Sequence, residues 1–365
     1  MSLYWEISLL NKVTVLNYSL KHSARFPNLR ALMWDDTKLY CSRGYSILCY
    51  NTELPHQTWE PIGQCHPRTS QKLYGKSKIL SRIKRSGFHH LIRLKDHSLL
   101  GVIDKAIVKL NPDTNLFENV FTIKRGTRPL SIASNPQGHL FWGEYFNNAH
   151  REEVHIYASY DLGESWSIIY TFPNSTIRHI HNILWDPYLK TFWIFTGDDH
   201  NECFIMKADE NMANFEIVFK GSQNIRCVAA IPRPEGLYFA TDTPLEANNI
   251  CIIEKSSTIR ILSDLPSSSL SACNISELLF FSSAVEPSNV NLTKYTSLKF
   301  SDNGHTWENI VSWKKSALPS KLFQFANISL PTGNNSSSFL AATGISVANE
   351  HMTTHIWEIQ KERND

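Results

Sequence analysis

The octet SYDLGESW at residues 159–166 has a near copy, FSDNGHTW, at residues 300–307. Each copy holds an aspartate, a glycine and a tryptophan at the same offsets: Asp161, Gly163, Trp166, Asp302, Gly304 and Trp307. In a turn, the aspartate can accept backbone N–H groups, glycine tolerates a positive φ, and tryptophan can pack between sheets. We therefore predict that each octet is a turn between two strands, with a structural role and no chemistry of its own.

Strand-like segments recur around the two octets at intervals of roughly 40 to 60 residues, the scale of four-stranded propeller blades. Six of them share one pattern: TWEPIGQ at 58, LFENVFTI at 116, SWSIIYTF at 165, NFEIVFKG at 214, TIRILSDL at 258 and TWENIVSW at 306. We predict an all-β chain, 1–365, forming a single propeller. Its repeats are placed at about 29–64, 86–124, 127–173, 177–221, 224–266, 270–313 and 320–359.

The number of blades is most simply seven, although six is possible if one of the first two repeats is misread. The last repeat lacks an outer strand, whereas residues 12–20 have the outer-strand pattern with no blade before them. Because a closed ring removes exposed sheet edges, we expect this N-terminal strand to complete the last blade.

Composition and charge exclude several classes of function. The 365 residues carry a net charge of +2 and are 42% hydrophobic, so the chain is neither disordered nor basic enough to predict nucleic-acid binding. No run of about 18 apolar residues predicts a membrane span. The start lacks the pattern of a signal peptide, and the seven cysteines show no CxxC spacing, so we expect reduced thiols and a cytoplasmic location.

Arginines stand at the start of the inner strand in three successive repeats: Arg128, Arg178 and Arg226. Inner strands surround the central channel, so we expect these guanidinium groups to converge on one pocket. Clustered cations require an anion or carboxylates nearby. The sequence thus predicts an anion-binding pocket, although each arginine could instead pair with a carboxylate and lock two blades together.

Loops on the same face supply acids, bases and further polar groups. The candidates are Glu144, Tyr145, Arg151, Asp198, Asp199, Asp242, Glu246 and Glu286, with His179 and His181 flanking Arg178. Such density of titratable groups is typical of a functional site. The histidines lack HExxH or a comparable ligand spacing, so we expect no metal ion, and no motif predicts another cofactor.

The octets resemble the Asp box, S-x-D-x-G-x-[ST]-W, of the sialidase-like (BNR) propeller family. Ser159, Asp161, Gly163, Ser165 and Trp166 match it fully, whereas Phe300 replaces the first serine of the second copy. The chain is similar to an uncharacterised bacterial branch of glycosyl-hydrolase-like propellers in its GEY, IRHIHNI, TGDD and TDTPLE segments. It departs from true sialidases, whose early Arg-Ile-Pro is here Arg82-Ile83-Lys84, so sialidase activity is not expected.

This resemblance implies a carbohydrate-active protein that binds an acidic sugar or anionic glycan through Arg128, Arg178 and Arg226. In a hydrolase, Asp198 or Asp199 would act with Glu144; in a lyase, Tyr145 or His181 would abstract a proton. Both reactions stay open. Other residues named above, His179, Arg151, Asp242, Glu246 and Glu286, would contact the substrate.

The alternative is a non-catalytic propeller that serves as a glycan-binding or protein-interaction scaffold, with protein partners unknown. Two structural features separate the hypotheses. An enzyme requires two carboxylates about 5 to 9.5 Å apart beside unpaired guanidinium groups. A scaffold requires arginines and acids that pair with each other.

Overall fold

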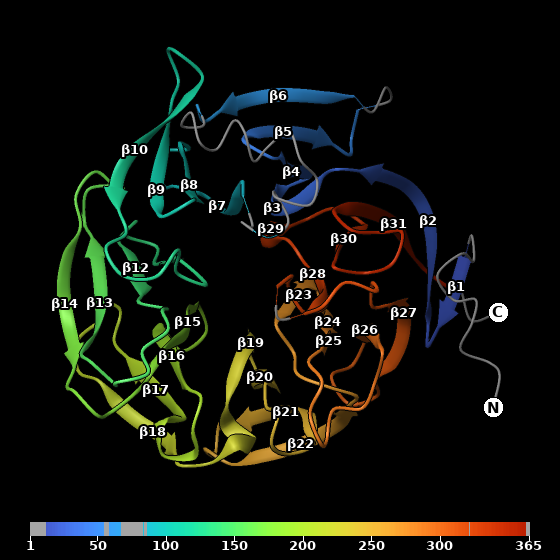
Figure 1. The fold of residues 1–365 in the computed structure, drawn as a ribbon. Coiled ribbons are helices and arrows are strands. Elements are labelled where there is room, and N and C mark those ends of the chain that lie inside the picture. Colours follow the sequence, from blue (N-terminus) through green and yellow to red (C-terminus); the bar gives the residue numbers. More distant parts are fainter. Residues whose placement is uncertain (1–11, 55–57, 67–82, 84–85, 321, 363–365) are drawn as a thin grey trace.

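In the computed structural model of the protein, the strands form six hydrogen-bonded sheets that divide into seven antiparallel blades around a central channel (Figure 1). The structure describes residues 12–54, 58–66, 83, 86–320 and 322–362. The propeller predicted from the repeated segments is therefore confirmed. Among these residues, no helical segment is long and apolar enough to cross a membrane.

Each blade contains four strands in order from the channel to the rim. Blade 1 is β3 (Arg30–Asp36), β4 (Lys38–Arg43), β5 (Ser46–Asn51) and β6 (Trp59–Gln64). Blade 2 is β7 (Phe88–Arg93), β8 (Leu99–Ile103), β9 (Ala106–Asn111) and β10 (Leu116–Thr122). Blade 3 is β11 (Ala133–Ser134), β12 (Leu140–Gly143), β13 (Val154–Ser159) and β14 (Ser167–Phe172). Blade 4 is β15 (His179–Asp186), β16 (Thr191–Gly197), β17 (Phe204–Ala208) and β18 (Glu216–Lys220).

The remaining blades follow the same order. Blade 5 is β19 (Cys227–Arg233), β20 (Gly236–Thr241), β21 (Asn248–Glu254) and β22 (Ile259–Leu265). Blade 6 is β23 (Ser271–Ile275), β24 (Leu278–Ser282), β26 (Tyr295–Ser301) and β27 (Glu308–Lys314). Blade 7 is β28 (Ala326–Ser329), β30 (Phe339–Ile345), β31 (Thr353–Lys361) and β2 (Tyr18–Pro27). Short elements link or extend the blades: β1 (Lys12–Val15), β25 (Ala284–Val285), β29 (Thr332–Asn335), η2 (His200–Glu202) and η3 (Gln223–Ile225).

The N-terminal strand closes the ring, as expected from the sequence. Strand β2 pairs antiparallel with β31, from Tyr18 opposite Lys361 to Pro27 opposite Thr353. Its limits differ from the predicted 12–20, because residues 12–15 form a separate strand, β1, that folds back on β2. Figure 1 shows the blue β2 beside the red β31 at the edge of blade 7.

The apolar core lies between the blades. Strands β8 and β24 are buried at every position, since both faces of their sheets pack against neighbouring blades. Phe141 of blade 3, for example, meets Phe192 of blade 4 edge to face, with ring centroids 4.9 Å apart. Aromatic pairs of this geometry stabilise a core beyond their buried area. All seven cysteines are unpaired, and five of them are buried within this core.

The first octet forms the turn between β13 and β14 by the predicted hydrogen bonds. Gly163 N donates to Ser159 Oγ at 2.8 Å, and Ser165 N donates to Asp161 Oδ1 at 2.9 Å. Gly163 has a φ of +88°, the conformation that favours glycine. Trp166 closes the turn by donating to Gly163 O at 3.1 Å.

The second octet uses different acceptors from those predicted. Gly304 N donates to Ser301 Oγ at 2.9 Å, and Thr306 N donates to Asn303 Oδ1 at 2.9 Å. Asp302 instead accepts from Asn17 Nδ2 at 3.0 Å. The assignment of Asp302 as the acceptor of the turn was wrong, because the turn between β26 and β27 is one residue shorter than the first. Trp307 is buried against Phe281 of its own blade.

Candidate functional site

The central channel holds a cavity of about 700 Å³ lined by the inner strands of several blades. Its charged and titratable wall residues are Arg30, His89, His90, Arg128, Tyr145, His181, Arg226, Asp242 and Glu286. Cavities of this size with a few convergent polar groups are the usual form of a ligand site. The inner strands all begin at one end of the propeller, which we name the channel face. The loops between the second and third strands of each blade lie at the same end.

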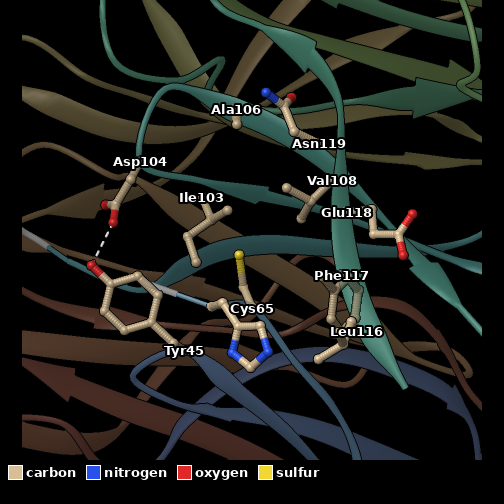
Figure 2. Close-up of a pocket in the computed structure, with 11 residues that line it drawn as sticks. Tyr45, Cys65, Ile103, Asp104, Ala106, Val108, Leu116, Phe117, Glu118 and Asn119 are labelled. Atoms are coloured by element: carbon tan, nitrogen blue, oxygen red, sulfur yellow. Dashed lines mark hydrogen bonds between the residues drawn. The ribbon is translucent and has the colours of Figure 1, made fainter. Parts of the chain in front are cut away.

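A smaller cavity of about 250 Å³ lies between blades 1 and 2 (Figure 2). Its lining is largely apolar and includes Ile103, Val108 and Phe117. Tyr45 donates a hydrogen bond of 2.6 Å to Asp104 at its edge. This cavity is a packing gap between two sheets, and the channel gathers far more charge.

β-Bulges on the inner strands direct histidines at the channel. In β7 the register with β8 shifts between Phe88 and His90, and in β15 the register with β16 shifts between Ile180 and Asn182. His89 and His181 are the extra residues at these two bulges. Bulges re-aim side chains in this way next to functional sites. Both rings are buried.

Asp198, in the loop that follows β16, is the hub of a hydrogen-bonded group that we name the Asp198 cluster. Its members are Arg178, His179, His181, Asp198 and Arg226. Arg178 Nη1 lies 2.9 Å from Asp198 Oδ2, and Arg226 Nη2 lies 3.0 Å from Asp198 Oδ1. Asp198 therefore joins the starts of the inner strands of blades 4 and 5.

The two histidines of the cluster also meet Asp198. The Nε2 atoms of His179 and His181 are 3.4 Å and 3.3 Å from Asp198 Oδ1. Arg178 and Arg226 both contact the Asp198 carboxylate and stabilise its negative charge. Asp198 is therefore a poor proton donor, which argues against the acid role expected for it.

Arg226 links Asp198 to a second carboxylate. Its Nη2 lies 3.5 Å from Asp242 Oδ2. Burial raises the pKa of Asp242 to about 6, because the opposing attraction of Arg226 only partly offsets desolvation and the repulsion from Glu286 and Asp198. Glu286 itself accepts from Ser268 at 2.6 Å. The carboxylates on this side of the channel are therefore engaged by neighbouring groups.

Tyr145 packs on the cluster as a ring contact. Its ring centroid lies 4.2 Å from that of His179 and 6.3 Å from that of His181. Burial raises its pKa, and the charges of Asp198 and Asp242 add to this effect. A raised pKa opposes the role of base that a lyase requires.

The other predicted catalytic acids lie in separate ion pairs. Glu144 is buried and pairs with Arg125, and it also accepts from His155 N at 2.9 Å. Asp199 and Glu202 both bind Arg151, each at 2.5 Å. Glu246 lies 3.9 Å from His200. Each of these acids is therefore engaged by a neighbouring basic side chain.

The three predicted arginines divide between two groups. Arg178 and Arg226 share Asp198, whereas Arg128 approaches His89, with its Nη1 3.2 Å from His89 Nε2. Arg30, which the sequence analysis missed, places its Nη1 3.1 Å from His89 Nδ1. We name Arg30, His89 and Arg128 the His89 cluster. Arg30 stands two residues before the extra residue of a bulge in blade 1, and Arg226 stands two residues before the extra residue of a bulge in blade 5. This likeness is visible in the strand register.

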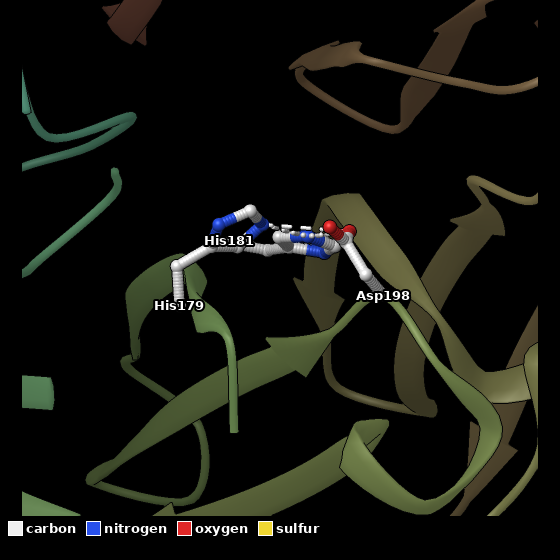
Figure 3. A group of neighbouring side chains, drawn as sticks. All are labelled: His179, His181 and Asp198. Atoms are coloured by element: carbon white, nitrogen blue, oxygen red, sulfur yellow. Dashed lines mark hydrogen bonds and ion pairs between the residues drawn. The ribbon is translucent and has the colours of Figure 1, made fainter. Parts of the chain in front are cut away.

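The expectation that no metal ion binds these histidines stays a prediction. His179, His181 and Asp198 nevertheless each offer one potential ligand atom, and these atoms lie within 4.8 Å of one another (Figure 3). The HExxH motif has a helical spacing, which these three residues lack. Here two residues of one strand meet a third from the loop after the next strand.

Comparisons with known proteins support the fold and no more. No protein-family model matches the sequence, and no curated protein matches it. A solved structure described as the WD40 β-propeller domain of Doa1 is similar over 93% of this chain and 96% of its own, with a TM-score of 0.57 and 10% identity. A chain from a structure of the mitotic checkpoint complex is similar over 98% of both chains, with a TM-score of 0.57 and 8% identity.

At such low identity, the similarity to these propellers shows the shared fold alone. Membership of the sialidase-like family, which rested on the octets, stays a prediction. Carbohydrate activity likewise has no support from these relatives.

Proposed function

We propose that the chain is a non-catalytic β-propeller that binds a protein partner on its channel face. The observation that carries the proposal is the pairing of the arginines. Arg151, Arg178 and Arg226 each form an ion pair with a carboxylate of the neighbouring loop or blade. Guanidinium groups used in this way fix the blades relative to each other and present a rigid surface.

Exposed apolar side chains on the same face support a protein partner. Leu245 follows β20 in blade 5, Leu292 precedes β26 in blade 6, and Leu322 precedes β28 in blade 7. Their exposed fractions are 56%, 77% and 63%. Val290 and Phe325 in the same loops are also exposed. Exposed apolar groups gathered on one face are typical of protein-interaction sites.

The loops that carry these side chains are held in place by buried amides. Asn248 Nδ2 donates to Asn291 Oδ1 at 3.0 Å, and Asn291 Nδ2 donates to Thr243 O at 3.0 Å. These bonds join the loop of blade 5 to that of blade 6. A surface ordered before binding loses less conformational entropy when the partner arrives.

The similar solved propellers support this reading at the level of the fold. One of them belongs to a structure described as a protein complex. A propeller scaffold for protein partners is therefore a role that this fold supports, and this chain carries an exposed apolar surface suited to it.

An anionic glycan is the second candidate ligand, supported by one observation. Arg30 and Arg128 both line the channel, and the Nε atom of Arg30 is buried without a hydrogen-bond acceptor. An acidic sugar in the channel would supply that acceptor.

Site-specific photo-crosslinking in the native host tests the proposal. A crosslinking residue at Leu292 or Leu322 is expected to capture the same protein. The matched controls are Ile261, equally exposed on the outer strand of blade 5, and Tyr188, on the turn between β15 and β16 at the opposite face; neither is expected to capture it. Leu245→Asp should abolish capture at Leu292 without changing the unfolding midpoint.

Thermal-shift screening with acidic monosaccharides and uronate oligomers tests the second candidate ligand, an anionic glycan. We expect no stabilisation of the wild type, and Arg178→Ala should lower the melting temperature with or without sugar. Stabilisation by an acidic sugar that disappears in Arg30→Ala, or equal crosslinking at all four positions, would contradict the protein-scaffold proposal.

A further inference from the structure

Three lone-pair atoms meet at the Asp198 cluster (Figure 3). The Nε2 atoms of His179 and His181 are 3.1 Å apart, and they lie 3.4 Å and 3.3 Å from Asp198 Oδ1. Both imidazoles are buried, and Asp198 is half-buried. This arrangement serves no purpose in the scaffold role, since Arg178 and Arg226 already join the blades through Asp198.

The other ring nitrogens determine which atoms carry protons. His179 Nδ1 lies 3.1 Å from Phe146 O, and His181 Nδ1 lies 3.2 Å from Cys227 O. A carbonyl oxygen can only accept, so each neutral ring places its proton on Nδ1 and presents a lone pair at Nε2. Two imidazole lone pairs and a carboxylate oxygen then face one another. Such a group is repulsive unless a cation, either a proton or a metal ion, lies among them.

The distances favour a metal ion over a shared proton. A charge-assisted N–H···O bond to a carboxylate is about 2.7 to 2.9 Å long. Both imidazole–carboxylate distances are well above this, and they are nearly equal. A proton would shorten one of them, whereas a metal ion bound to all three atoms keeps them equivalent.

The same distances indicate the coordination geometry. Zinc bonds of about 2.0 to 2.1 Å in a tetrahedron place neighbouring ligand atoms about 3.3 to 3.4 Å apart. Octahedral bonds of similar length would place them about 3.0 Å apart. The two imidazole–carboxylate distances, 3.3 and 3.4 Å, match the tetrahedral value, whereas the 3.1 Å between the two Nε2 atoms is nearer to the octahedral one.

The outer contacts match those of metal sites. Ligating histidines commonly donate their second nitrogen to a backbone carbonyl, and ligating carboxylates accept a further hydrogen bond. His179 and His181 meet Phe146 O and Cys227 O in this way, while Asp198 Oδ2 accepts from Arg178. These partners fix the ring orientations before any ion arrives.

Carboxylates near the ligands can offset part of the charge of a divalent ion. Arg226 contacts both Asp198 and Asp242. His181 lines the channel, which gives an anion or hydroxide access to the remaining coordination position.

We propose that His179, His181 and Asp198 bind one divalent transition-metal ion of the zinc class at the wall of the channel. This site is independent of the apolar surface on blades 5–7. Loss of partner binding would leave it intact, and loss of the metal would leave the exposed leucines in place.

Metal content of the full chain tests the proposal directly. Protein purified without a histidine tag is stripped with EDTA, dialysed against micromolar free Zn²⁺ and assayed by mass spectrometry. One zinc ion per chain is expected, together with a higher melting temperature that EDTA reverses. His179→Ala and His181→Ala are each expected to weaken zinc binding by about 10- to 100-fold or more.

His22→Ala is the matched control. His22 Nε2 lies 3.0 Å from His355 Nδ1, and His355 Nε2 lies 3.0 Å from Glu350 Oε2. This is also a group of two histidines and a carboxylate, but its atoms form a chain and do not converge. His22→Ala should therefore retain the zinc of the wild type.

A measurement on the wild type keeps the test valid if the ligand variants do not fold. Co²⁺ bound in place of Zn²⁺ should give the visible absorption of a tetrahedral N/O site, and added Zn²⁺ should remove it. Folded wild type that takes up no zinc, or ligand variants that bind it as the wild type does, would overturn the proposal. Equal zinc loss in His22→Ala would overturn it as well.

Discussion

The Asp198 cluster and the His89 cluster lie on different sides of one channel, and they are built on the same backbone feature. His181 and His89 are both the extra residue of an inner-strand bulge. Around His181 the partner is a carboxylate, at 3.3 Å. Around His89 the contacts include two guanidinium groups, from Arg30 and Arg128. The bulge determines where the imidazole points, and the neighbouring loops determine the charge that it meets.

This difference has energetic consequences. Asp198 forms ion pairs with two arginines, so its half-buried negative charge is well compensated. A neutral imidazole has one N–H group, yet both ring nitrogens of His89 face guanidinium donors. At one of the two contacts, the N–H group of the imidazole therefore faces an N–H group of a guanidinium, and the two donors repel each other. The Asp198 cluster should stabilise the native state, and the His89 cluster should contribute little or oppose it.

Removing the hub carboxylate should have the largest effect. Asp198→Ala leaves two partly buried guanidinium groups without their acceptor, and we expect a loss of about 3 to 5 kcal/mol in the free energy of unfolding. Asp199→Ala is the control, since its side chain is 68% exposed in a surface ion pair worth about 1 kcal/mol or less. Urea denaturation in EDTA measures both. Equal losses would show that Asp198 has no special role.

Replacing one arginine of each cluster by methionine should separate the two clusters. Arg226→Met removes a partner of Asp198 and Asp242, and it should cost about 2 to 3 kcal/mol. Arg30→Met removes a buried guanidinium whose pKa burial lowers to about 10, and it should be neutral or stabilising. Urea denaturation in EDTA measures the free energy of unfolding of both variants. A larger loss for Arg30→Met would reverse the comparison.

The two sides of the channel should also respond to pH with opposite signs. Burial, with Arg30 and Arg128 nearby, lowers the pKa of His90 to about 3 from 6.5. Between these values the unfolded chain binds the extra proton, so this residue makes stability fall as pH falls. Asp242, whose pKa is raised to about 6 from 3.8, binds its proton in the folded chain and makes stability rise as pH falls.

Unfolding free energies measured between pH 4 and pH 6 separate these contributions. His90→Asn should flatten the loss of stability on acidification, and Asp242→Asn should steepen it, each by up to about 1.4 kcal/mol per pH unit. Opposite changes, or none, would show that these groups titrate alike in the folded and unfolded chain.

The fold was readable from the sequence because its signals are local. The octets and the recurring outer strands each report a single turn or strand, and the unpaired strand pattern near the N-terminus pointed to ring closure. Local pattern failed at Asp302, where a turn shorter by one residue moved the acceptor to Asn303. Offsets in a sequence do not reveal how many residues a turn contains.

The candidate site was only partly readable. The face and most of its residues followed from the strand order. The ion-pair partners of these residues did not follow from it, because the contact of Arg226 with Asp198 depends on how two blades pack. The convergence of His179, His181 and Asp198 also depends on a bulge, which no motif at a helical spacing describes.

Ring closure by β2 has a consequence for how the protein is made. The ribosome produces β2 several hundred residues before its partner β31, with Tyr18 pairing with Lys361. At roughly 5 to 20 residues per second, β2 waits for its partner on the order of 20 to 70 seconds. During that time it is an unpaired edge that could join another chain. Lys21 and Arg25, both exposed on this strand, are the kind of charged residue that discourages such pairing until β31 emerges.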